Sequence, residues 1–117
     1  MVFRYNEDGN ITSLDPAFTR NIENIWATTH MFNGLVQLND NLEVIPDIAV
    51  RWKVSVDGLV YEFQIREDVY FHKHYAFGDK KTRKVIASDF VYSLKRLLDP
   101  QIASPGSWVL QNVEHIE

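Results

Sequence analysis

Alternating and periodic apolar positions divide the chain into short strands and two helices. Residues 2–6 alternate apolar and polar side chains, as a short strand does. The spacing then changes to that of an amphipathic helix, with its inner face at Ile22, Ile25, Trp26, Thr29 and Phe32. Gly34 suits the left-handed cap of such a helix. We therefore expect a helix over about residues 21–33.

The middle of the chain predicts hairpins. Residues 35–38 and 42–45 read as brief strands around a turn at residues 39–41, and residues 48–52 as a short helical turn leading into a strand. The strongest hairpin signal is Asp57-Gly58, because the segments on both sides of it alternate. Tyr61, Phe63 and Ile65 would then face one side of the second strand.

The last third predicts a loop, a helix and a tail. Residues 72–84 form a polar loop with its tip at Gly78-Asp79. Ser88-Asp89 can cap a second amphipathic helix, which Asp99-Pro100 ends. Short apolar segments at residues 108–110 and 113–116 follow, as a helical turn and a strand. The fold class is α+β: a small mixed sheet with a β-hairpin and two packed helices, in a single domain over residues 1–117.

Composition and charge narrow the function classes. A chain of 117 residues is long enough for one domain with one core. The net charge of −4 argues against nucleic-acid binding, and the basic cluster at Lys80, Lys81, Arg83 and Lys84 reads as a solvated loop. The chain has no cysteine, which excludes disulfides, thiolate zinc sites and a cysteine nucleophile.

No motif assembles a catalytic centre. Phosphate loops, a nucleophile elbow and a zinc-protease helix motif are all missing from the sequence. His72 and His74 would share one face of a strand and so could share a metal ion, but neighbouring lysines repel a cation and no third ligand is evident. We expect no enzyme, no cofactor and no metal site.

Six segments in a fixed order carry a family resemblance. They are SLDP at residues 13–16, MFNGLV at 31–36, PDIAVRW at 46–52, DGLVYEFQIR at 57–66, VYFH at 69–72 and ASDFVYSLKR at 87–96. Asp99-Pro100 and Ala103-Ser104-Pro105 complete the series. Together they resemble the family 5 extracellular solute-binding proteins, the oligopeptide, dipeptide and nickel-binding group. The chain departs from the family pattern in a longer loop over residues 74–86 and in Asn33, where the family has glutamate.

The resemblance implies a fragment of a two-lobed periplasmic-binding-protein type II fold. The chain would supply the first strand of lobe one and most of the family's small subdomain, without the second lobe. It would capture oligopeptide or dipeptide-like solutes between lobes and deliver them to the membrane permease of an ABC importer. The resemblance places the protein in the periplasm or outside the cell, with an export signal or lipid anchor upstream of Met1 and peripheral membrane association through that anchor. The alternative is a stand-alone protein-interaction or metal-binding module that reuses the subdomain.

Two stretches would border the ligand by position in the family. The first holds Arg20, Asn21 and Ile22, and the second holds Gly106 and Trp108. Arg20 could pair with a ligand carboxylate, or be a solvent-exposed arginine before a helix. Trp108 could stack on the ligand, or pack within the subdomain.

Overall fold

The computed structural model describes residue 6 and residues 9–114 of the chain. All of the strand expected at residues 2–6 except Asn6, and the last two residues of the strand expected at 113–116, lie outside these described residues. The chain forms two compact units. Unit one joins the residues up to Phe32 with those from Val91 onward, and unit two is Asn33–Phe90.

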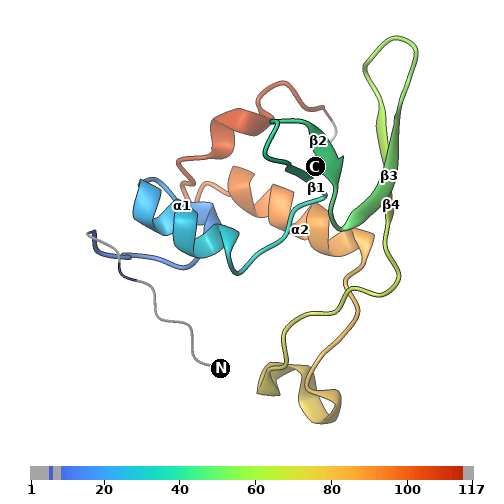
Figure 1. Cartoon of the computed structure of the whole chain (residues 1–117). Helices are drawn as coiled ribbons and strands as arrows, with labels where there is room; N and C mark the ends of the chain where they lie inside the picture. Colours follow the sequence, from blue (N-terminus) through green and yellow to red (C-terminus); the bar gives the residue numbers. More distant parts are fainter. Residues whose placement is uncertain (1–5, 7–8, 115–117) are drawn as a thin grey trace. The chain divides into compact units, whose positions relative to one another are not determined.

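Unit one consists of helices and the loops between them (Figure 1). Its elements are η1 (Pro16–Phe18), α1 (Ile22–Thr29), the greater part of α2 (Ala87–Leu98) and η3 (Ser107–Leu110). The helix expected at 21–33 ends at Thr29 because the last turn is closed by side chains. The Thr29 hydroxyl donates to the Trp26 carbonyl at 2.9 Å, and His30 Nδ1 lies 2.7 Å from the same oxygen.

Gly34 does not form the left-handed cap that the sequence predicts. The described glycines with positive φ are Gly58 and Gly78, so this prediction is wrong. The Asp47 carboxylate holds this turn instead. It accepts from Gly34 N–H at 3.1 Å, and its two oxygens accept from the Asn33 side-chain amide at 3.1 and 3.2 Å. A Cβ at Gly34 would lie 3.0 Å from the Val36 carbonyl oxygen, which explains the glycine.

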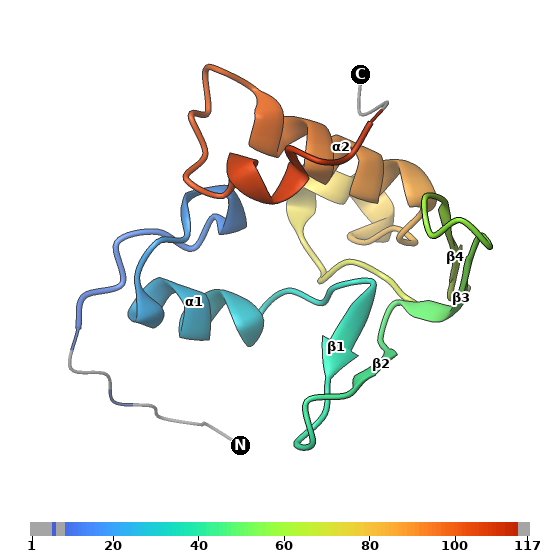
Figure 2. The same cartoon turned by 90° about the horizontal axis from the view of Figure 1, so that it is seen from above.

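Unit two contains the strands (Figure 2). β1 (Val36–Leu38) pairs antiparallel with β2 (Val44–Pro46), and β3 (Ala49–Val54) pairs antiparallel with β4 (Tyr61–Ile65). The helical turn expected at residues 48–52 is wrong, because Ala49 already pairs with Ile65 in the β3–β4 ladder. The α+β class is confirmed, and the strands expected in one small mixed sheet are distributed over two antiparallel pairs.

The β3–β4 turn follows the predicted chemistry. Gly58 adopts a φ of 73°, a region that favours glycine. The Asp57 carboxylate accepts from the Ser55 hydroxyl at 2.5 Å and from Leu59 N–H at 3.1 Å. The bond from Ser55 holds the pKa of the Asp57 carboxyl below its usual value. The predicted hairpin at Asp57-Gly58 is therefore confirmed.

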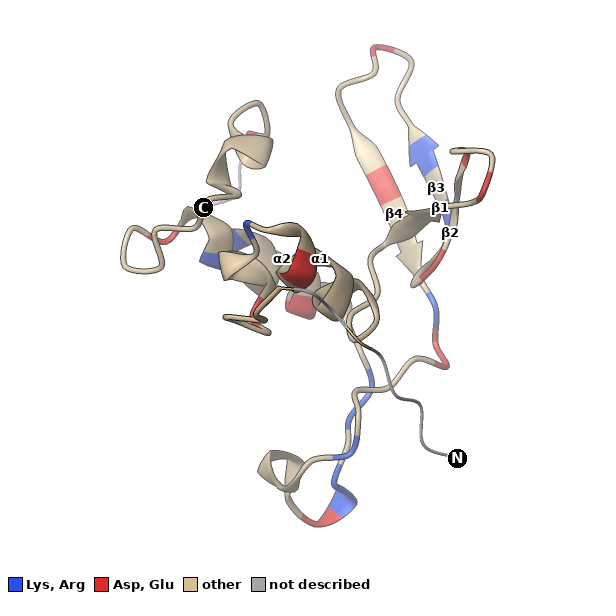
Figure 3. Ribbon diagram, turned by 60° about the vertical axis from the view of Figure 1, so that its left-hand side comes forward, with Lys and Arg blue, Asp and Glu red and all other residues tan. Residues whose placement is uncertain are grey.

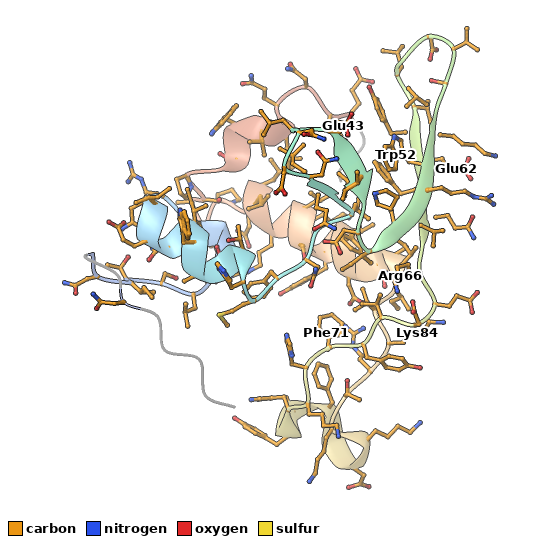
Figure 4. All side chains as sticks on the ribbon, viewed as in Figure 1. Glu43, Trp52, Glu62, Arg66, Phe71 and Lys84 are labelled. Carbon is orange, nitrogen blue, oxygen red and sulfur yellow. The ribbon has the colours of Figure 1, made fainter. Side chains whose placement is uncertain are left out.

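The two units bury little apolar surface. The buried apolar residues among those described are Ala17, Ile48, Ala49 and Val85. At the end of the β3–β4 hairpin, Val56, Leu59 and Val60 are exposed. Figure 4 marks Trp52 and Glu62 on this hairpin, and Trp52 is half-buried.

Candidate ligand-binding site

A carboxylate links two parts of unit one that lie far apart in sequence. Asp15 accepts from Arg96 of α2 at 2.6 and 2.5 Å, a two-pronged ion pair across 81 residues. Asp15 also caps η1 by accepting from Ala17 N–H at 3.0 Å. The hydrogen bond from Arg96 holds the pKa of the Asp15 carboxyl below its usual value, although partial burial opposes the shift. The segment before α1 is thus fixed to α2.

Ser104 joins the same segment to the loop after α2. Its hydroxyl donates to the Ala17 carbonyl at 2.7 Å, and both residues are buried. The Ser104 oxygen in turn accepts from Gly106 N–H at 3.2 Å. The two stretches predicted to border the ligand therefore begin from one shared contact, three residues before Arg20 and two before Gly106.

Asn24 fixes the chain leading into η1 onto α1. Its side chain accepts from Thr12 N–H at 3.0 Å and donates to the Thr12 hydroxyl at 2.9 Å. Asn24 is 2% exposed, so these bonds satisfy a polar group that has almost no access to water. Together with Asp15 and Ser104, this buried amide gives unit one a polar framework in place of a large apolar core.

The first predicted stretch lies at the start of α1. The Asn21 side chain is engaged as the helix cap, accepting from Asn24 N–H at 3.2 Å. Ile22 is 57% exposed, so its side chain is available for contact. Arg20 is exposed and forms no ion pair with any residue that the structure describes.

The second predicted stretch forms the start of η3. Gly106 caps this turn with a φ of −93°, a conformation open to any residue, so backbone strain does not explain the glycine. Trp108 is 67% exposed, and its ring is not packed within unit one. The structure joins the two stretches at Ala17 and Ser104, and each leaves one large apolar side chain, Ile22 or Trp108, in solvent.

A cavity of about 580 Å³ lies beside the Asp15–Arg96 pair. It does not include any of the five predicted residues. Its lining comes from η1, from the end of the segment after α1 and from one face of α2: Asp15, Pro16, Ala17, Phe32, Tyr92, Ser93, Leu94, Arg96 and Leu97. Sequence reasoning missed this cavity and the residues that frame it. The available signal was the recurrence of Asp15 and Arg96 in the family motifs, but motifs do not show which charges pair.

The histidine pair does not form a metal centre. His74 Nδ1 accepts from Ala76 N–H at 3.2 Å and caps η2 (Tyr75–Lys80), and its ring lies 4.1 Å from the Tyr75 ring. Across residues 6 and 9–114, no three or more His, Cys, Asp or Glu side chains gather closely enough to hold a metal ion. Within the same residues, no helix has the length and apolar character to span a membrane.

These features define a scaffold that holds loops in place and leaves selected side chains free, which is how binding proteins present a ligand site. Residues 43–117 match the family described as bacterial extracellular solute-binding proteins, family 5 middle region. The chain belongs to the family 5 bacterial extracellular solute-binding proteins. This is a family of binding proteins, in agreement with the expectation that the chain is no enzyme.

Curated relatives and a solved structure agree with this assignment. The periplasmic murein peptide-binding protein MppA of Escherichia coli is 38% identical over 82% of this chain and 16% of its own length. The probable di/tripeptide-binding protein 5 of Pseudomonas aeruginosa is 46% identical over 70% of this chain and 15% of its own. The periplasmic binding protein DppA of Helicobacter pylori, solved with the peptide STSA, matches with a TM-score of 0.68 and 34% identity, over 82% of this chain and 19% of the other. The chain thus spans less than a fifth of the length of these proteins.

Proposed function

We propose that these residues act within the substrate-binding component of an ABC importer, capturing peptide-like solutes between two lobes and delivering them to a membrane permease. The observation that carries the proposal is family membership together with relatives that are themselves named as peptide-binding proteins. The neighbour solved with a peptide supports the same ligand class. Such binding breaks no bond, in agreement with membership of a family of solute-binding proteins.

The proposed ligand contacts are Arg20, Asn21, Ile22, Gly106 and Trp108. An exposed guanidinium such as that of Arg20 pairs well with a terminal carboxylate of a peptide. The exposed indole of Trp108 offers a rigid apolar face, and Ile22 adds apolar contact area. Asn21 would act through the position of α1, since its side chain already caps that helix.

In this proposal the chain contributes the first strand of lobe one and most of a small subdomain. The opposing lobe supplies further ligand contacts, and closure about a hinge shelters the cargo. We further propose that the protein works outside the cytoplasm, since the relatives include periplasmic binding proteins. A lipid anchor would hold it near its permease.

Calorimetry with di- to pentapeptides tests this proposal on the protein encoded by the complete reading frame. We expect binding of at least one peptide, and about a tenfold weaker affinity after Arg20→Ala, because one charge-assisted contact is lost. Lys53→Ala on β3 is the matched control and should leave the affinity unchanged. The 117 residues alone should bind weakly or not at all. A full-length protein that gives no heat with any peptide would overturn the proposal.

A further inference from the structure

Residues 69–85 form a long loop closed at its base by an isolated β-bridge between Tyr70 and Lys84, here called the basic arm (Figure 1). Its two sides are joined by backbone hydrogen bonds from Val85 N–H to the Val69 carbonyl at 2.9 Å, from Phe71 N–H to the Arg83 carbonyl at 2.9 Å and from His74 N–H to the Lys81 carbonyl at 2.6 Å. η2 closes its tip. The segment expected as a loop over residues 72–84 thus carries backbone pairing along its sides and the 3-10 helix η2 at its tip.

The arm is stabilised by its own side chains. The Phe71 and Phe77 rings pack with centroids 5.6 Å apart, and the Arg83 guanidinium lies 4.6 Å from the Phe71 ring centroid. Arg83 also forms a two-pronged ion pair with Asp89 at the start of α2. Figure 4 marks Phe71 and Lys84 on this arm. Arg83 thus supports the arm, and Lys84 pairs with Glu67 at 3.6 Å.

Three lysines of the arm have no such structural task. Lys73, Lys80 and Lys81 are exposed, and none forms an ion pair with a residue in the described part of the chain. The backbone bond between His74 and Lys81 brings all three to the tip. Beside them Tyr75 is 84% exposed, with its ring against His74. The tip combines free ammonium groups with an exposed aromatic ring.

The arm and the remainder of the chain carry opposite charge. Residues 72–84 contain five basic and one acidic side chain, hence +4, while the whole chain is −4, so the other residues total −8 (Figure 3). An anionic surface would attract the arm and repel the other residues of this chain. Binding to such a surface would therefore be confined to the arm and would weaken with salt.

We propose that the tip of the basic arm docks on an anionic phospholipid surface. Lysines bind lipid phosphates, and an exposed tyrosine suits the boundary between headgroups and acyl chains, where one end of the ring is wet and the other apolar. An acidic protein surface could also bind the lysines, but it offers no apolar layer for the exposed Tyr75 ring at the tip. This docking is independent of solute binding and orients the protein at the membrane.

Vesicle sedimentation tests the docking with the purified chain. We expect binding to vesicles with roughly 30% phosphatidylglycerol, no binding to pure phosphatidylcholine, and release by about 0.5 M NaCl. The double variant Lys73→Gln/Lys80→Gln should lower the partition coefficient about 25-fold, at about fivefold per lysine. Adding Tyr75→Ser to this double variant should lower the partition coefficient further.

The matched control is Lys53→Gln/Lys95→Gln, which removes the same charge from β3 and α2 and should bind as the parent does. Circular dichroism establishes that both double variants keep the parent's fold. The proposal would be overturned if both double variants lowered the partition coefficient equally. It would also be overturned if the parent did not bind phosphatidylglycerol vesicles. Binding to polyglutamate without binding to vesicles would also overturn it and would assign the arm to an acidic protein.

Discussion

Single polar side chains determine how the loops of unit one are held. Asp15 caps η1 and pairs with Arg96, and Ser104 donates to the Ala17 carbonyl. A buried donor or acceptor left without its partner costs more than the bond itself contributes. Substitutions of Asp15 or Ser104 should therefore lower the stability of unit one.

The Asp15 carboxyl gives the fold an acid-sensitive contact. Its pKa is lowered in the folded chain by the hydrogen bond from Arg96, so the stabilisation is fully present above the unfolded pKa, about 3.9. It is lost as the pH falls through the folded pKa. Thermal unfolding from about pH 6 to about pH 2 should show a smaller loss of melting temperature for Asp15→Asn than for the parent. Asp40→Asn, on the exposed β1–β2 turn, should behave as the parent; a parallel response of parent and Asp15→Asn would contradict the prediction.

Gly58 is required by its backbone conformation. At a φ of 73° an alanine is strained, so Gly58→Ala should lower the free energy of unfolding by about 1–2 kcal/mol. Gly106→Ala is the control, because Gly106 has a φ of −93° and its added Cβ would meet only an ordinary contact, 3.6 Å from Ser104. Chemical denaturation measures both variants. Equal effects at the two glycines would argue against a conformational origin.

The sequence predicted the helices and turns whose boundaries depend on residues close together in the chain. The Asp57-Gly58 turn and the end of α2 at Asp99-Pro100 follow from residues close together in sequence. The start of α2 differs, because the helix begins at Ala87 and holds the predicted cap, Ser88-Asp89, within its first turn. The end of α1 and the strand at Ala49 did not follow, because a side-chain cap at His30 and pairing with Ile65 decide them. Periodicity over a few apolar residues cannot separate a helical turn from a strand whose partner lies far along the chain.

The residues expected to contact ligand stay predictions, and the contacts that position them did not follow from the sequence. The family resemblance indicated the two stretches around Arg20 and Trp108. The contact that joins these stretches, from Ser104 to Ala17, spans 87 residues. The Asp15–Arg96 pair and the cavity beside it also depend on long-range packing. Long-range pairing of this kind leaves no spacing pattern in a single sequence.

The Ser104 bond should stabilise the loop that carries Trp108. Ser104→Ala leaves the buried Ala17 carbonyl without its donor, at a cost of about 1–2 kcal/mol. Amide hydrogen exchange should accelerate in η1 and η3 together, because both depend on this bond. Ser107→Ala changes an exposed serine in η3 and should leave exchange in η1 as it is. Acceleration confined to η3 would show that the two stretches are not coupled.

The whole chain exposes many apolar side chains and spans a small part of the length of its relatives. Val56, Leu59 and Val60 project from the β3–β4 hairpin into solvent, and the chain spans 15–16% of two of its peptide-binding relatives. Isolated domains seldom leave such apolar side chains uncovered. In the proposed function, the opposing lobe supplies the further surface that ligand binding needs.

Trp108 should contribute to binding in the protein encoded by the complete reading frame. Trp108→Ala removes an exposed indole from the proposed site and should weaken peptide affinity about tenfold. Trp26→Ala, in α1, removes a similar ring that stacks on His30 and should change stability rather than affinity. Calorimetry separates the two effects. An unchanged affinity after Trp108→Ala would remove this residue from the site.

In the proposed function the protein shelters a peptide and leaves it chemically intact. Native mass spectrometry of that same complete protein, incubated with a tetrapeptide, measures both parts of the claim at once. We expect a one-to-one complex from which the peptide is released at its original mass. Release of shorter peptides, or no complex at any concentration, would contradict it.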